Sequence, residues 1–220
     1  MKRNRARIVS ADIAECALFT ALMIAGAYIS IPFPFVPLTF QTVFATLAGL
    51  LMGWKKGMLS TAAYMILGLA GVPVFTSGGG FSYVLKPSFG FVVGFVAAAV
   101  TGGLFFGGSK KLWHFIVLSL CACAVNYVIG GAFIYVWLIV NGSQDIASSM
   151  VNWVFVFIPK DIVLAVLAAI VAWKVKPVIV RMRQKYVRRD EIGSSDAQNQ
   201  VCTSEKGGGF QSDIKDKYSK

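Results

Sequence analysis

GVPVFTSGGGFSYVLKPSFGFVVG, residues 71–94, is the stretch around which the rest of the chain is organised. Three consecutive glycines permit backbone angles that are closed to other residues. Pro73 and Pro87 fix their own φ and push the residue before each of them away from helix. The stretch therefore predicts a shaped, non-helical loop between apolar segments. Its aromatic side chains and its one cation are typical of the wall of a small-molecule pocket.

The composition is that of an integral membrane protein. Of the 220 residues, 56% are hydrophobic and 14% are charged, whereas a soluble domain has about 45–50% apolar and about 25% charged residues. The formal net charge of +11 would favour nucleic-acid binding in a soluble protein. Here the basic residues gather at the chain ends and in two short loops, as membrane orientation requires. We therefore expect no nucleic-acid partner.

The apolar segments on both sides of the Gly-rich loop predict an all-α membrane protein, a bundle of six transmembrane helices. The predicted spans are residues 12–31, 39–53, 58–72, 88–106, 112–140 and 151–173. The second and third spans are short for a bilayer. Between the spans we expect a Pro-rich turn at residues 31–38, tight basic turns at 54–57 and 107–111, and a polar loop at 141–149.

We expect residues 1–177 to form the membrane domain. Residues 178–220 are basic and then polar, and we expect this tail to be cytoplasmic and largely disordered. With six spans, the ends of the chain and the two basic turns lie on one side and carry nineteen of the 21 Lys and Arg residues. The positive-inside rule then predicts a multi-pass plasma-membrane protein with both termini in the cytoplasm.

Lys86 and Lys160 are the two basic residues on the predicted outer side, and Asp161 is an acid inside a predicted span. An aspartate at the centre of a membrane helix costs about 2.5–3.5 kcal/mol, so Asp161 needs a partner. One interpretation is an ion pair with Lys160 or Lys86, or a place near the interface. The other is a carboxylate that accepts hydrogen bonds from a bound solute.

Other polar and aromatic residues of the outer side are candidates for the same site. Lys86 would meet a solute carboxylate, unless it is a solvated loop lysine. Tyr83 and Phe75 would stack on a ring, unless they only anchor the interface. Thr39 and Gln41 would contribute a hydroxyl and an amide, unless they cap a helix. Asn126 interrupts the apolar fifth span and is a further candidate.

Small residues in two spans predict close helix contacts. Ala17, Ala21 and Ala25 form a stripe on one face of the first span, either for packing inside this chain or for docking onto a separate membrane protein. Gly90 and Gly94 form a GxxxG face in the fourth span.

Several kinds of site are missing from the sequence. It contains no Walker A motif, so a P-loop ATPase is excluded. No span carries a series of acids or histidines for a proton relay, which disfavours a self-sufficient secondary transporter. The four cysteines do not form a disulfide framework or a metal pair, and we expect neither a metal nor a cofactor. A nucleophile or metal cluster for a lipid-modifying enzyme is also lacking.

Four segments together resemble one known family: IPFPFVPLTFQT, LAGLLMGWKKGMLS, YMILGLAGVPVF and KPSFGFVVGF, all within residues 29–95. The likeness continues through PKDIVLAVLAA near Pro159. These segments are similar to those of the BioY family, the biotin-binding S components of energy-coupling factor (ECF) transporters. In this resemblance Asp161 matches the acid of the family's PxD segment, and residues 78–83 match its Gly-rich loop. Lys160 stands where members often have glycine.

The resemblance implies a six-helix protein that captures biotin at its outer face and delivers it to the cytoplasm. Its implied partners are a transmembrane coupling protein and two cytoplasmic ATPases, and it would not itself be an enzyme. Asp161, with Asn126 or Gln41, would face the ureido ring, and Lys86 or Lys160 would serve the carboxylate. The alternatives are an S component for a different small vitamin, a membrane-embedded lipid-modifying enzyme and a structural scaffold.

Overall fold

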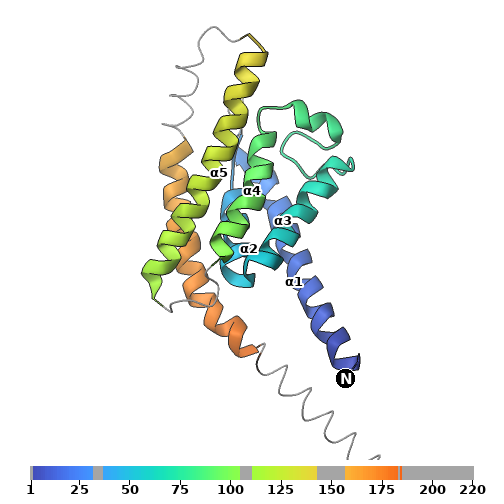
Figure 1. Ribbon diagram of the computed structural model, residues 1–220, viewed down its shortest axis with the longest axis vertical. Coiled ribbons are helices and arrows are strands. Elements are labelled where there is room, and N and C mark those ends of the chain that lie inside the picture. Colours follow the sequence, from blue (N-terminus) through green and yellow to red (C-terminus); the bar gives the residue numbers. More distant parts are fainter. Residues whose placement is uncertain (1, 32–36, 105–110, 143–156, 183, 185–220) are drawn as a thin grey trace, which may run out of the picture. The chain divides into compact units, whose positions relative to one another are not determined.

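The computed structural model describes residues 2–31, 37–104, 111–142, 157–182 and 184. The chain divides into two compact units, Met1–Lys176 and Pro177–Lys220. Apart from two strands of two residues, the regular structure described is helical, which confirms the all-α expectation (Figure 1). The α-helices are α1 (Lys2–Tyr28), α2 (Gln41–Met52), α3 (Trp54–Leu69), α4 (Phe89–Gly103), α5 (Leu112–Val140) and a last helix, Phe157–Met182.

Parts of several predicted segments lie outside the described residues. They are most of the Pro-rich turn, the basic residues around 107–110, the polar loop from residue 143, the start of the sixth span, Cys202 and nearly all of the predicted tail. Within the described part, three helices are long and apolar enough to cross a membrane: Ser10–Tyr28, Leu112–Val140 and Phe157–Met182. The count of six spans therefore stays a prediction.

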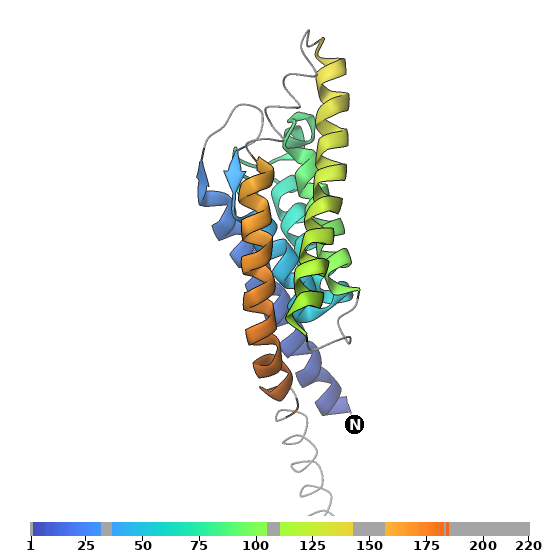
Figure 2. The same ribbon diagram turned by 90° about the vertical axis from the view of Figure 1, so that its left-hand side faces the viewer.

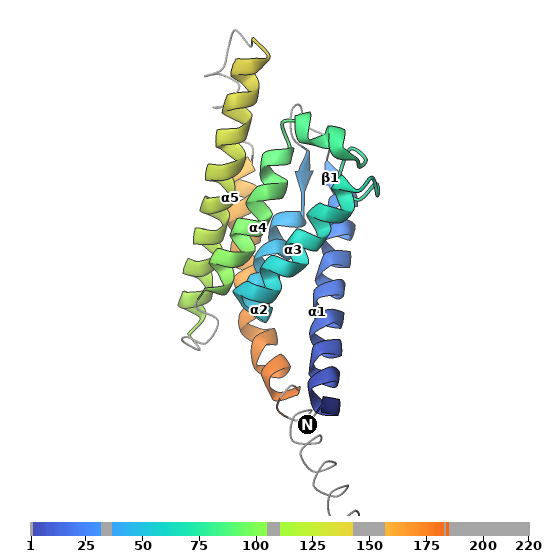
Figure 3. The same cartoon turned by 45° about the vertical axis from the view of Figure 1, so that its right-hand side comes forward.

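Helix α2 lies at the centre of the first unit and contacts α1, α3, α4 and α5 (Figure 3). Every residue of α2 except Val43 and Phe44 is buried. Gly53, with a φ of 85° that suits glycine, alone separates α2 from α3. The predicted basic turn at residues 54–57 is therefore wrong, because these residues form the first turn of α3.

Glycines of α4 face α5 and let the two helices approach closely. A Cβ atom on Gly90 would lie 2.3 Å from the Cβ of Phe133, and one on Gly94 would lie 2.2 Å from Oδ1 of Asn126. No side chain fits in that space. The close contact predicted from the GxxxG pattern is confirmed.

Polar groups join α1 to α3. Lys56 of α3 forms ion pairs with Asp12 and Glu15 of α1. Further along the same two helices, the Thr20 hydroxyl donates to the Ser60 carbonyl oxygen at 3.0 Å. Charged and hydroxyl groups in an apolar helix thus find partners on the neighbouring helix.

The opposite face of α1 is exposed within the described part of the chain. Ala17, Ala21 and Ala25 are all exposed, so none of them packs against another described element. The stripe is therefore available to lipid or to another protein.

Residues 71–80, the first part of the Gly-rich segment, contain no helix. Gly71, Gly78 and Gly80 have φ values of 103°, 102° and 106°, which other residues rarely adopt. A short 3-10 helix, η1 (Phe81–Leu85), then follows, where the sequence predicted only irregular loop. At the same end of the first unit, β1 (Ser30–Ile31) and β2 (Leu38–Thr39) pair antiparallel (Figure 2).

Candidate functional site

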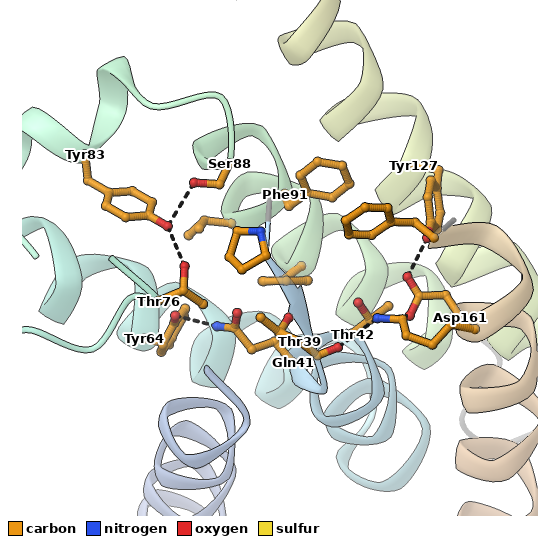
Figure 4. A pocket seen from close by; sticks show the side chains of 15 residues that line it. Thr39, Gln41, Thr42, Tyr64, Thr76, Tyr83, Ser88, Phe91, Tyr127 and Asp161 are labelled. Carbon is orange, nitrogen blue, oxygen red and sulfur yellow. Dashed lines mark hydrogen bonds and ion pairs between the residues drawn. The ribbon is translucent and has the colours of Figure 1, made fainter. Parts of the chain in front are cut away.

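A pocket lies at the N-terminal end of α2, between the Gly-rich segment, α4, α5 and the last helix (Figure 4). Its empty volume is about 470 Å³, part of it open to solvent. The lining residues are Pro37, Thr39, Gln41, Thr42, Tyr64, Thr76, Tyr83, Ser88, Phe91, Val92, Phe95, Tyr127, Phe157, Lys160 and Asp161.

One end of the pocket is charged. Asp161 is 5% exposed, and the Tyr127 hydroxyl donates to its Oδ2 at 2.5 Å. Nζ of Lys160 lies 2.9 Å from Oδ1 as an ion pair that compensates the charge. Among the described residues Oδ1 has no other polar partner. This oxygen is an acceptor still available to a ligand.

The same lysine connects the last helix to β2. Nζ of Lys160 donates to the backbone carbonyl oxygen of Thr39 at 3.0 Å, and it lies 5.9 Å from the centroid of the Phe157 ring. Its side chain is 26% exposed. The ammonium is thus held between a carboxylate, a carbonyl and an aromatic face.

A group of hydroxyls, Thr76, Tyr83 and Ser88, forms another polar end of the pocket, away from Asp161 in Figure 4. The Ser88 hydroxyl donates to the Tyr83 hydroxyl at 2.9 Å. Thr76 Oγ1 lies 3.2 Å from the same oxygen, and either group can donate in that contact. We call these three residues the hydroxyl cluster.

A second tyrosine of the pocket, Tyr64 of α3, lies beside the start of α2. Nε2 of Gln41 donates to the Tyr64 hydroxyl at 2.5 Å, and that hydroxyl donates to the carbonyl oxygen of Val74 at 3.2 Å. Gln41 and Tyr64 are both buried. These bonds connect α2, α3 and the Gly-rich segment below the pocket.

The structure brings together some of the residues that the sequence singled out for substrate binding. Those in the pocket lining are Asp161, Lys160, Tyr83, Gln41 and Thr39. Phe75, Lys86 and Asn126 are not among the lining residues.

Each of these three has a different surrounding. Phe75 is buried behind the wall, with its ring centroid 4.4 Å from that of Tyr83. Lys86 is exposed and donates to the carbonyl oxygen of Ser77 at 3.0 Å. Asn126 is buried against Gly94 in the contact between α4 and α5.

Sequence reasoning missed five polar residues of the pocket: Thr42, Tyr64, Thr76, Ser88 and Tyr127. The tyrosines offered a signal, because both fall in the interior of apolar helices, whereas tyrosine concentrates at membrane interfaces. Thr76 and Ser88 offered none, since small hydroxyl residues are common in any loop.

A family model described as the BioY family matches residues 1–181. The chain belongs to the BioY family. It is 40% identical over 167 residues to the probable biotin transporter BioY of Lysinibacillus sphaericus, a match that covers 71% of this chain and 82% of the relative. It is 30% identical over 166 residues to the biotin transporter BioY of Thermotoga maritima, which covers 75% of this chain and 95% of that protein.

A solved structure has the same fold. It is the crystal structure of the S-component for biotin from an ECF-type ABC transporter, and it matches with a TM-score of 0.61 and 26% sequence identity. The match covers 78% of this chain and 93% of that one. The family membership found in sequence thus extends to the fold.

Proposed function

We propose that this protein is the substrate-binding S component of an ECF-type biotin transporter. Family membership over residues 1–181 and the names of its relatives support this function. In this role the protein binds and releases biotin without changing it, so it is not an enzyme. Biotin is the transported substrate.

The observation that carries the proposal is the charged end of the pocket. Biotin has a fused ureido ring whose two N–H groups donate and whose carbonyl oxygen accepts hydrogen bonds. Oδ1 of Asp161 is a buried acceptor whose one polar neighbour among the described residues is Lys160, and the Lys160 ammonium is a donor. An acceptor and a donor side by side match the edge of a ureido group.

Apolar residues continue from this end. Phe91, Val92 and Phe95 of α4 are buried lining residues, and they suit the thioether ring and the aliphatic chain of biotin. Burying that hydrocarbon supplies affinity at about 25 cal/mol per Å² of apolar surface. The polar groups then fix which way round the molecule lies.

We infer that biotin enters from outside the cell. The predicted arrangement has six spans, both termini and the 178–220 tail in the cytoplasm, and the pocket facing outward in the plasma membrane. The distribution of Lys and Arg supports it. The sequence has no Walker A motif, so uptake against a gradient would use a transmembrane coupling protein and two cytoplasmic ATPases.

The docking face for the coupling protein would be the Ala17, Ala21 and Ala25 stripe. All three side chains are exposed, and this favours docking over packing inside the chain. Small side chains allow a partner helix to approach closely.

The test of the proposed function is binding of labelled biotin to the purified protein in detergent. We expect saturable binding that unlabelled biotin abolishes and that an unrelated vitamin, such as thiamine, leaves unchanged. Absence of binding at micromolar biotin by a monodisperse sample would refute the proposal.

A further inference from the structure

The cation in the pocket lining is already engaged. Lys160 pairs with Asp161 at 2.9 Å and donates to the Thr39 carbonyl oxygen at 3.0 Å. Among the described lining residues Lys160 is the one lysine, and there is no arginine. The undescribed segments that precede Pro37 and Phe157, residues 32–36 and 143–156, contain no lysine, arginine or histidine in the sequence.

A carboxylate ligand is poorly placed at this end. Any anion that approached Lys160 would also approach the buried carboxylate of Asp161, and like charges at close range repel strongly where water is scarce. A neutral group that both donates and accepts meets no such repulsion. The ureido ring is therefore the better occupant of the charged end, and the carboxyl arm of biotin points elsewhere.

The hydroxyl cluster forms the other polar end of the pocket. Thr76, Tyr83 and Ser88 carry three hydroxyl protons, and their two mutual hydrogen bonds use two of them. The remaining O–H can donate to a ligand, and the hydroxyl oxygens retain lone pairs that accept. Such a cluster can donate to a carboxylate or to the carbonyl oxygen of a primary amide, and it can also accept from the amide N–H.

Lys86 does not supply that counter-charge from outside. Its Nζ lies 5.2 Å from the centroid of the Tyr83 ring and donates to the Ser77 carbonyl oxygen. The side chain is exposed, so water and salt screen its charge.

We propose that the pocket holds the carboxyl arm of biotin at the neutral hydroxyls of Thr76, Tyr83 and Ser88, so that its substrate class includes uncharged carboxyl derivatives such as biotin amide. This inference rests on the proposed function and names the part of the substrate that the pocket does not select by charge.

Competition against labelled biotin on the purified protein tests it. We expect biotin amide to bind within about fivefold of biotin, whereas a site that paired a cation with the carboxylate would favour the acid by about tenfold or more. The double variant Tyr83→Phe, Ser88→Ala should weaken both ligands by a similar factor. The matched control is Ser82→Ala, an exposed serine in the same segment that does not line the pocket.

A variant of Lys86 decides between the two interpretations. Lys86→Gln should leave the ratio of the two affinities within twofold of that in the unaltered protein. The inference would be overturned if biotin amide bound more than about tenfold more weakly than biotin, or if Lys86→Gln weakened biotin but not the amide. If the unaltered protein failed to bind biotin, the proposed function and this inference would both fall.

Discussion

The two oxygens of Asp161 have different partners. Oδ2 accepts a hydrogen bond from Tyr127, whereas Oδ1 faces only the charge of Lys160. A buried carboxylate with one oxygen fixed by a tyrosine cannot turn away from the pocket without losing that bond. Its second oxygen is thereby held ready for a ligand donor.

Replacing Asp161 with asparagine tests this role. Asp161→Asn keeps the size of the side chain but removes the charge, and we expect the dissociation constant for biotin to rise by about 10- to 150-fold, because hydrogen bonds to charged groups contribute about 1.5–3 kcal/mol. Equilibrium binding to the purified variant measures it. Asp12→Asn is the matched control, since Asp12 lies on α1, pairs with Lys56 of α3 and does not line the pocket. Unchanged affinity in a well-folded Asp161→Asn protein would show that Asp161 is structural.

The sequence identifies a candidate site residue where placing its side chain in the predicted surroundings costs free energy. Asp161 attracts notice because a charge in an apolar helix needs a reason. Lys86 was predicted to bind the substrate but does not line the pocket. The direction of its side chain depends on the backbone path of the Gly-rich segment, which composition does not specify. Asp12 and Glu15 also lie in an apolar helix, and their partner, Lys56, comes from a segment predicted as a turn.

Among the helices, the contact between α2 and α4 depends on glycine at one position and not at another. A Cβ atom on Gly49 would lie 2.1 Å from the carbonyl oxygen of Ala99. On Gly102 it would lie 3.4 Å from the nearest atom, the carbonyl oxygen of Thr46. Both glycines are buried in helices, so an alanine has the same intrinsic helix preference at each.

The pair of alanine variants measures this contact. We expect Gly49→Ala to destabilise the fold by about 1–3 kcal/mol, because overpacking against backbone forces the helices apart. Gly102→Ala should be close to neutral. Thermal unfolding of the two purified variants, followed by loss of monodisperse protein, gives the comparison. Equal melting temperatures would mean that α2 and α4 do not approach as closely at Gly49 as described.

Helix positions were predictable where hydropathy changes sharply. The sequence predicts a span at residues 112–140, and α5 is Leu112–Val140. It does not predict that α1 begins at Lys2, because lysine and arginine extend a helix well without adding hydrophobicity. Nor does it predict that α3 begins at Trp54, since one glycine with positive φ turns the chain without a loop.

For the molecule as a whole, binding and transport should be separable. Ala21→Trp places a large ring on the exposed stripe of α1, on a residue that does not line the pocket. We expect biotin binding by the purified variant to stay within twofold, and accumulation of biotin by cells to fall at least tenfold, because a partner helix can no longer approach.

Val128→Trp is the matched control, since Val128 is also an exposed residue of an apolar helix but lies in α5, away from the stripe, and does not line the pocket. Normal accumulation with Ala21→Trp would place the docking face elsewhere. Loss of binding together with transport would instead favour packing inside the chain.

Orientation is a second prediction for the whole molecule. Nineteen of the 21 basic residues lie on the predicted inner side, so tags at both ends of the chain should be inaccessible to antibody in intact cells and accessible after permeabilisation. An outer-surface tag of known exposure serves as the control. A tag at the C-terminus that is labelled in intact cells would reverse the topology and place the pocket on the cytoplasmic side.

The burial of α2 at the centre of the helices also concerns the membrane around the protein. Beyond Gln41 and Thr42, which line the pocket, α2 continues with residues 45–52, which are all buried and uncharged. A proton or sodium ion that crossed here would leave water for an apolar interior, at a cost of many kcal/mol. We therefore expect the resting protein to conduct no ions along α2, so that a cell could keep many copies in its membrane without discharging its ion gradients.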